Sequence, residues 1–211
     1  MEIELLINKN RSSILFLLCY NVIGRGDMEK VYLKVPSTNE LHFRKEWLSN
    51  PNTMSYNAGF DLDIKGYDKN TGTITLTDEE LLNWYHRWIN HEPDRYYAYI
   101  YSKNIDEPIG EIYYYPDNET HSMGILIDYK YRGKGYSYEA LIELERIAFE
   151  KNNINELIDE FPLSRESAIK TFTKAGFIIT NNDKTEKIFD KETIIKQLQI
   201  TKEMYYKKEG M

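Results

Sequence analysis

Tyr131-Arg132-Gly133-Lys134-Gly135-Tyr136-Ser137 is a glycine-rich turn between two segments with different hydrophobic patterns. The segment before it, 123–127, is a short apolar run of the kind that forms a buried strand. The segment after it, 138–152, repeats apolar residues at three- and four-residue spacing, which predicts an amphipathic helix. A turn that opens a helix presents uncovered N–H groups and the positive end of the helix dipole. The stretch therefore predicts a pyrophosphate site.

This turn differs from two common nucleotide-binding loops. A Walker A loop needs Ser or Thr after its lysine, but Gly135 follows Lys134. A dinucleotide-binding fingerprint needs a third glycine in an early βαβ unit, which is missing here. The run instead resembles the R-x-x-G-x-[GA] loop of the GNAT N-acetyltransferases, where the loop grips the pyrophosphate of acetyl-CoA. The resemblance implies coenzyme binding by Arg132, Gly133, Lys134, Gly135, Tyr136 and Ser137.

Further motifs follow the same family order. Residues 107–112 resemble the third strand of the family, and residues 168–177, which end in Gly176-Phe177, resemble its closing helix and strand. Residues 135–141 look like the helix start of the subgroup that acetylates ribosomal-protein N-termini. The resemblance is close over 107–177 and rests on element order alone over 28–106. It identifies the chain as similar to GNAT enzymes, nearest to that ribosomal-protein subgroup.

The expected fold is α/β with a mixed sheet, the acyl-CoA N-acyltransferase fold, in the order β-α-α-β-β-β-α-β-α-β. The resemblance implies that strands 121–128 and 156–161 splay apart to admit the pantetheine arm. Backbone groups of Leu126 and Ile127 would then pair with the pantetheine amides, as an added strand would.

Three regions are predicted along the chain. Residues 1–27 are an N-terminal extension, because the first strand-like alternation begins after Met28, and this extension suggests a misassigned start. Residues 28–190 form the acetyltransferase domain. Residues 191–211 are expected to be a helical tail, because Ile194, Ile195 and Leu198 recur at helical spacing.

Two residues are candidates for the catalytic base. Counting back from Ile127 places His121 at the position that several family members use, and an imidazole with a pKa near 6.5 suits proton removal at neutral pH. Glu111, on the neighbouring predicted strand, is the competing base, or a group that binds a cationic acceptor. The tyrosine that often protonates the leaving thiolate in the family is replaced by Phe172, which leaves the general acid unidentified.

Composition limits the partners. The chain has 27 Lys and Arg against 34 Asp and Glu, a net charge of −7, which argues against nucleic-acid binding and favours amine acceptors. One cysteine and four unpaired histidines predict no metal site and a cytoplasmic protein, and no segment reaches the length of a membrane span. A homodimer is expected to be possible.

The predicted function is acetyl transfer from acetyl-CoA to a primary amine of a small molecule or a protein N-terminus. Tyr56 and Asn57 are candidate substrate contacts, because they lie in the turn-rich segment where the family places its acceptor loop. The replacement at Phe172 leaves an alternative open, a catalytically silent acyl-CoA-binding sensor or interaction module.

Overall fold

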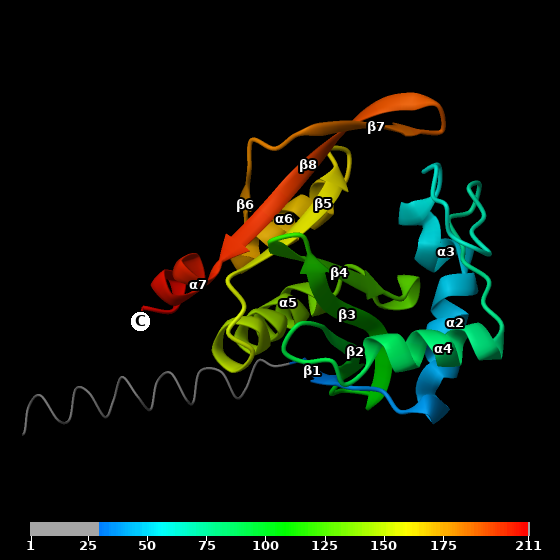
Figure 1. The fold of residues 1–211 in the computed structure, drawn as a ribbon, viewed down its shortest axis with the longest axis horizontal. Helices are drawn as coiled ribbons and strands as arrows, with labels where there is room; N and C mark the ends of the chain where they lie inside the picture. Colours follow the sequence, from blue (N-terminus) through cyan, green and yellow to red (C-terminus); the bar gives the residue numbers. More distant parts are fainter. Residues whose placement is uncertain (1–29, 211) are drawn as a thin grey trace, which may run out of the picture. The chain divides into compact units, whose positions relative to one another are not determined.

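The computed structural model describes residues 30–210, and the predicted extension 1–27 lies outside the described residues. From Val31 onward the chain forms one compact unit built on a mixed sheet in the order β1-β2-β3-β4-β5-β8-β6, with β7 paired to β8 (Figure 1). The strands are β1 (Val31–Lys34), β2 (Tyr96–Ser102), β3 (Glu107–Asp117), β4 (Thr120–Ile127), β5 (Glu156–Pro162), β6 (Ile178–Ile179), β7 (Lys184–Ile188) and β8 (Lys191–Thr201).

The helices connect these strands in the predicted order, so the expected fold class is confirmed. They are η1 (Thr38–Glu40), α2 (Leu41–Ser49), α3 (Pro51–Met54), η2 (Ser55–Asn57), α4 (Asp78–Trp88), η3 (Tyr129–Tyr131), α5 (Tyr136–Arg146), the π-helical turn η4 (Ile147–Lys151), α6 (Glu166–Ala175) and α7 (Lys202–Glu209). Thr77 begins α4 with a capping box, in which Oγ1 of Thr77 accepts from the Glu80 N–H and the Glu80 carboxylate accepts from the Thr77 N–H.

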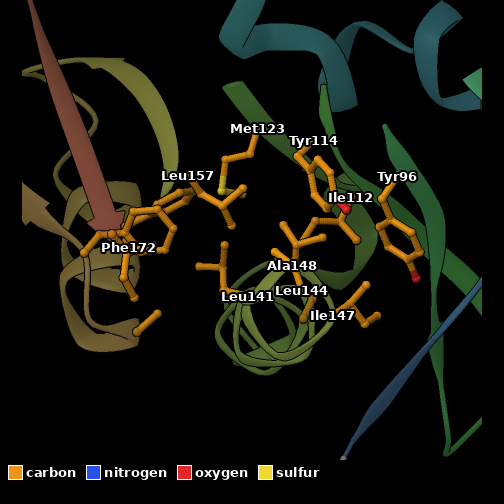
Figure 2. Close-up of a cluster of buried hydrophobic side chains, with 14 of the residues drawn as sticks. Tyr96, Ile112, Tyr114, Met123, Leu141, Leu144, Ile147, Ala148, Leu157 and Phe172 are labelled. Atoms are coloured by element: carbon orange, nitrogen blue, oxygen red, sulfur yellow. The ribbon is translucent and has the colours of Figure 1, made fainter. Parts of the chain in front are cut away.

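The two faces of the sheet carry separate cores. On one face, α5 and α6 pack against alternate residues of the central strands, and Figure 2 shows Leu141 and Leu144 of α5 beneath Met123 and Ile112. On the other face, α2 and α4 cover an aromatic cluster that includes Trp47, Trp84 and several of the many tyrosines. The period-two alternation of β3 and β4 therefore decides which face each candidate side chain reaches.

Strands β4 and β5 run parallel but pair at one position, Ser122 with Ile158. Every other adjacent pair of long strands is antiparallel with extended pairing, as between β3 and β4. Beyond Ser122 the two strands separate, and their carboxyl ends lead into the glycine-rich turn and into α6 respectively. This is the opening that the sequence predicted, and its edges offer backbone groups to a bound chain.

The predicted helical tail is wrong over its first half. Residues 191–201 form β8, which pairs with β5, β6 and β7 and is part of the same sheet, and only Lys202–Glu209 is helical. The β-branched run Thr193-Ile194-Ile195 favours a strand, and the sheet buries Leu198 and Ile200 completely. The acetyltransferase unit therefore does not end at 190, since β7 and β8 form one hairpin.

Within residues 30–210, no helix is both long and apolar enough to cross a membrane. The same residues contain no group of three or more His, Cys, Asp and Glu side chains arranged to hold a metal ion. The cytoplasmic location and the possible homodimer stay predictions.

Candidate active site between strands β4 and β5

The glycine-rich turn has the geometry of an anion site at the start of α5. Gly135 is the N-cap of α5 with φ 85°, and Gly133 has φ 75°, so both occupy the left-handed region that glycine adopts without strain. No atom lies within 4 Å of the place where a side chain on Gly133 would begin, and residues 133–135 are exposed. Tyr136 packs its ring into the core, so its backbone N–H is the group available to a ligand. The turn fits a pyrophosphate.

Arg132 holds this turn in place through hydrogen bonds to three backbone carbonyls. Its Nε donates to the carbonyl of Ile127 at 3.1 Å, its Nη1 donates to the carbonyl of Asn52 at 3.0 Å, and its Nη2 donates to the carbonyl of Thr53. These bonds tie the end of β4 to α3 and engage the Ile127 carbonyl, which had been expected to meet the pantetheine. The predicted coenzyme contacts of Leu126, Ile127 and Arg132 therefore stay predictions, and the bonds of Arg132 are all to backbone.

Tyr56 lies across the open end of the gap. The guanidinium of Arg132, after β4, is 4.3 Å from the centre of its ring, and that of Arg165, after β5, is 5.0 Å away. Arg165 also donates to the Tyr56 carbonyl. The ring is thus occupied by the protein's own cations rather than left free for an acceptor.

Asn57, the second predicted substrate contact, turns its carbonyl to the hydroxyl of Tyr67. Its side chain lies beside Met54. Two residues later the Gly59 carbonyl accepts from the N–H of Phe189, at the tip of the β7–β8 hairpin. The segment that carries Tyr56 and Asn57 is therefore held in place from several sides next to the gap.

Glu111 is part of a buried ion pair. Arg44, on α2, donates to one carboxylate oxygen, and the hydroxyl of Tyr97 donates to the other. The Arg44 guanidinium also stacks 4.0 Å from the Trp84 ring. Burial opposes the charge of Arg44, but the Glu111 carboxylate outweighs it, and the net effect raises the pKa of Arg44 above its usual value. Each oxygen of Glu111 thus accepts a bond from a neighbouring buried side chain.

His121 lies on the opposite face of the sheet from Glu111. It pairs with Pro116 in the register, is half-buried, and meets the Tyr114 ring edge-on at 5.7 Å between ring centres. Burial lowers the pKa of His121 below 6.5, against the opposing effects of Asp94 and Glu156. The imidazole is therefore neutral at pH 7 and able to accept a proton. The structure does not bring the two predicted catalytic residues together.

Two residues that the sequence analysis did not select lie near the gap. Asp159 follows directly after Ile158, which makes the single β4–β5 pairing. Tyr113 reaches across β4 from β3, because a side chain on Gly124 would begin 2.5 Å from the Tyr113 hydroxyl oxygen. Phe172 is buried between Phe161 and Phe177, and it has no hydroxyl to offer.

An acidic pocket of about 750 Å³ adjoins the single pairing of β4 and β5. Its lining is formed by Asp117, Asn118, Glu119, Thr120, Ser122, Ile158, Glu160, Lys184 and Gln197. Glu160 pairs with Lys184 at 2.5 Å, whereas Asp117 and Glu119 form no ion pair with any residue of 30–210. Because Ser122 and Ile158 both line it, the pocket lies next to the point where the strands separate.

Comparisons with known proteins agree with this geometry. The profile of the acetyltransferase (GNAT) domain matches residues 33–178. No curated protein sequence matches the chain.

Solved structures share the fold at low sequence identity. A spermidine N-acetyltransferase from Vibrio cholerae, in complex with CoA and spermine, is 17% identical, with a TM-score of 0.67 over 83% of this chain and 98% of that one. A GNAT-family acetyltransferase from Bacillus anthracis is 16% identical, with a TM-score of 0.62 over 83% of this chain and 96% of that one. Such identities establish the fold and do not assign the chain to the predicted ribosomal-protein subgroup. The domain match covers well over half of the sequence, and the chain belongs to the GNAT family of acetyl-CoA-dependent N-acetyltransferases.

Proposed function

We propose that this enzyme acetylates a cationic primary amine that carries more than one positive charge, such as a polyamine. The observation that carries this proposal is the pocket beside the β4–β5 gap, where three carboxylates face a single lysine. A cation gains from carboxylates that have no cationic partner of their own, and Asp117 and Glu119 have none within 30–210. The spermidine N-acetyltransferase from Vibrio cholerae, which was solved with spermine bound, supports the same class of acceptor.

The proposed roles of the residues follow from their positions. The turn 133–137 binds the pyrophosphate of acetyl-CoA through backbone N–H groups at the start of α5. The edges of β4 and β5 hold the pantetheine arm in the gap, and the acidic pocket orients the amine toward the acyl group. Acetyl-CoA supplies the acetyl group as a thioester.

We expect spermidine to give a kcat/KM roughly tenfold above that of phenethylamine, because the pocket attracts the additional charges of the polyamine. The measurement is release of free thiol from acetyl-CoA with a panel of amines and N-terminal peptides. A higher salt concentration should reduce the difference in kcat/KM between spermidine and phenethylamine, since the attraction acts between partly exposed charges.

A control variant isolates the pocket. Glu119→Gln should raise the KM for spermidine and leave the KM for acetyl-CoA unchanged, because Glu119 is an exposed carboxylate of the pocket lining. Faster turnover of a peptide N-terminus or of phenethylamine than of spermidine would contradict the proposed acceptor class.

His121 is the proposed base, in preference to Glu111, because its imidazole is neutral at pH 7 and has no ion-pair partner within 30–210. His121 lies one residue before Ser122 on β4 and points to the opposite face of the strand, so the proposed role requires the amine to reach the imidazole around the edge of β4.

We expect His121→Ala to lower the rate at saturating acetyl-CoA by roughly 10²–10⁴-fold. The wild-type rate should fall as the pH drops below 6.5, since protonated imidazole cannot accept a proton and burial shifts its titration downward. His86→Ala, at an exposed position of α4, is the matched control and should behave as wild type. An unchanged rate in His121→Ala would assign the base elsewhere.

A further inference from the structure

The step that lacks a residue is protonation of the leaving thiolate. Amine acetylation breaks the C–S bond of the thioester, and the electron pair goes to sulfur, which is a better leaving group if a nearby acid supplies a proton. Phe172 carries no hydroxyl and is buried among aromatic rings. A side-chain donor would therefore have to be another residue near the gap between β4 and β5.

Asp159 occupies the right place on the strand. It is the first residue of β5 beyond the Ser122–Ile158 pairing, where the gap begins. Its neighbours on the same face, Leu157 and Phe161, both belong to the buried core beneath the sheet. Phe161 contacts the Phe172 ring at 4.8 Å between centres. A carboxyl group in this apolar row stands about 7 Å along the strand from the Phe161 position.

Few neighbouring groups stabilise a negative charge on the Asp159 carboxyl. Among residues 30–210 its one hydrogen bond comes from the N–H of Glu160, at 2.8 Å, and it forms no ion pair. Arg165, at the start of α6, attracts its charge without reaching ion-pair distance, and the Glu160 carboxylate repels it. Tyr113 and Tyr115, on β3, also lie within its electrostatic reach. A structural carboxylate would have a cation or several donors around it.

The surroundings of Asp159 also shift the pKa of its carboxyl. Burial raises the pKa of the Asp159 carboxyl from 3.8 to about 8, despite the opposing hydrogen bond from Glu160 and the charge of Arg165. A carboxyl group with this pKa has an affinity for its proton close to that of a free thiolate, near 8.5. This match suits a general acid.

We propose that Asp159 is the general acid that protonates the coenzyme A thiolate as it leaves. The amine nitrogen forms the C–N bond, the C–S bond breaks, and the sulfur takes the proton of the Asp159 carboxyl. The proton lost by the amine passes to the base, and solvent exchange returns a proton to Asp159. The products are the acetylated amine and free coenzyme A, so atoms and charges balance. The proposal applies to whichever amine the enzyme accepts.

The first test is Asp159→Asn, which keeps the shape of the side chain and removes the acidic proton of the carboxyl. In single-turnover assays with spermidine, or with another amine that the wild type accepts, the rate should fall by roughly 10²–10⁴-fold while the Kd of acetyl-CoA is preserved. Glu166→Gln, at an exposed position of α6 where the carboxylate pairs with Lys170, is the matched control and should behave as wild type. A rate close to wild type in Asp159→Asn would overturn the proposal.

The pH profile separates catalysis from a structural role. The wild-type rate should decline as the pH rises through about 8, because an acid that has lost its proton cannot donate, and Asp159→Asn should lack this decline. Asp159→Glu should restore part of the rate. If the Asn variant does not fold, the absence of the alkaline decline in the wild type would itself overturn the proposal. Tyr113→Phe removes the hydroxyl of the other residue near the gap. A large loss of rate in this variant, together with a wild-type rate in Asp159→Asn, would assign the donor to Tyr113.

A spectroscopic measurement is independent of the acceptor. Infrared difference spectra of the wild type between pH 6 and pH 10 should contain a protonated-carboxyl band that is missing from Asp159→Asn. If no amine in the panel is acetylated, this band still decides whether Asp159 carries the proton, so failure of the acceptor proposal and failure of this one give different results.

Discussion

Replacing Gly135 with aspartate should raise the Kd of acetyl-CoA by roughly 100-fold or more, because like charges forced together cost several kcal/mol and each tenfold corresponds to about 1.4 kcal/mol. Gly135 caps α5 at φ 85°, where a side chain is strained and where we propose that N–H groups bind the pyrophosphate. Isothermal titration calorimetry with acetyl-CoA measures the loss directly.

The control for strain comes from elsewhere in the chain. Gly210 caps α7 at φ 76°, with no atom within 4 Å of the place where a side chain would begin. Gly210→Asp therefore adds the same charge in the same backbone region away from the turn and should bind acetyl-CoA normally. Gly135→Ala separates strain from charge, and we expect its effect to be smaller. Wild-type affinity in a folded Gly135→Asp protein would remove the turn from the coenzyme site.

Local signals explain why the glycine-rich turn and its flanking strand and helix could be predicted from the sequence. The turn, the apolar run before it and the periodic helix after it all lie within about thirty residues. The glycine positions and the spacing of apolar residues therefore predict all three elements. The capping box that begins α4 depends on an equally local pattern, because Thr77 and Glu80 are three residues apart. The family resemblance added the order of the remaining strands.

Non-local pairing explains what was missed. Residues 191–201 combine helical spacing with β-branched residues, and the available edges of β5 and β7 decide in favour of a strand. Glu111 looked available in sequence because its partner, Arg44, lies 67 positions earlier on another element. No local pattern reveals such a pair.

Asp159 was not selected although the sequence carried a signal. Leu157, Asp159 and Phe161 share one face of a strand, and two of the three are buried, so a carboxyl group interrupts an apolar row. Such a residue is costly unless it is paired or neutral. A search for acidic residues at apolar positions of predicted strands would have selected it, although only the structure places it at the β4–β5 gap.

The Arg44–Glu111 pair is the part of the site where the largest change in stability is expected. Arg44→Met should lower the free energy of unfolding by about 3–5 kcal/mol, because it leaves the Glu111 carboxylate buried without its cation. The side chain of Glu111 is 4% exposed, so water cannot take the place of the guanidinium. Thermal and urea unfolding of the variant give this value, and the midpoint should fall by roughly 10 °C for a chain of this size.

The double variant tests whether the charge, rather than the packing, causes this loss. Arg44→Met with Glu111→Leu removes both charges and keeps apolar volume beside Trp84 and Tyr97, so it should recover most of the stability. Lys45→Met, next in sequence and paired at the surface with Asp78, should cost about 0–1 kcal/mol and serves as the exposed control. Equal stability of the single and double variants would contradict the assignment. If the double variant also retains turnover, Glu111 positions α2 on the sheet and takes no proton from the amine, which leaves that role to the proposed base on β4.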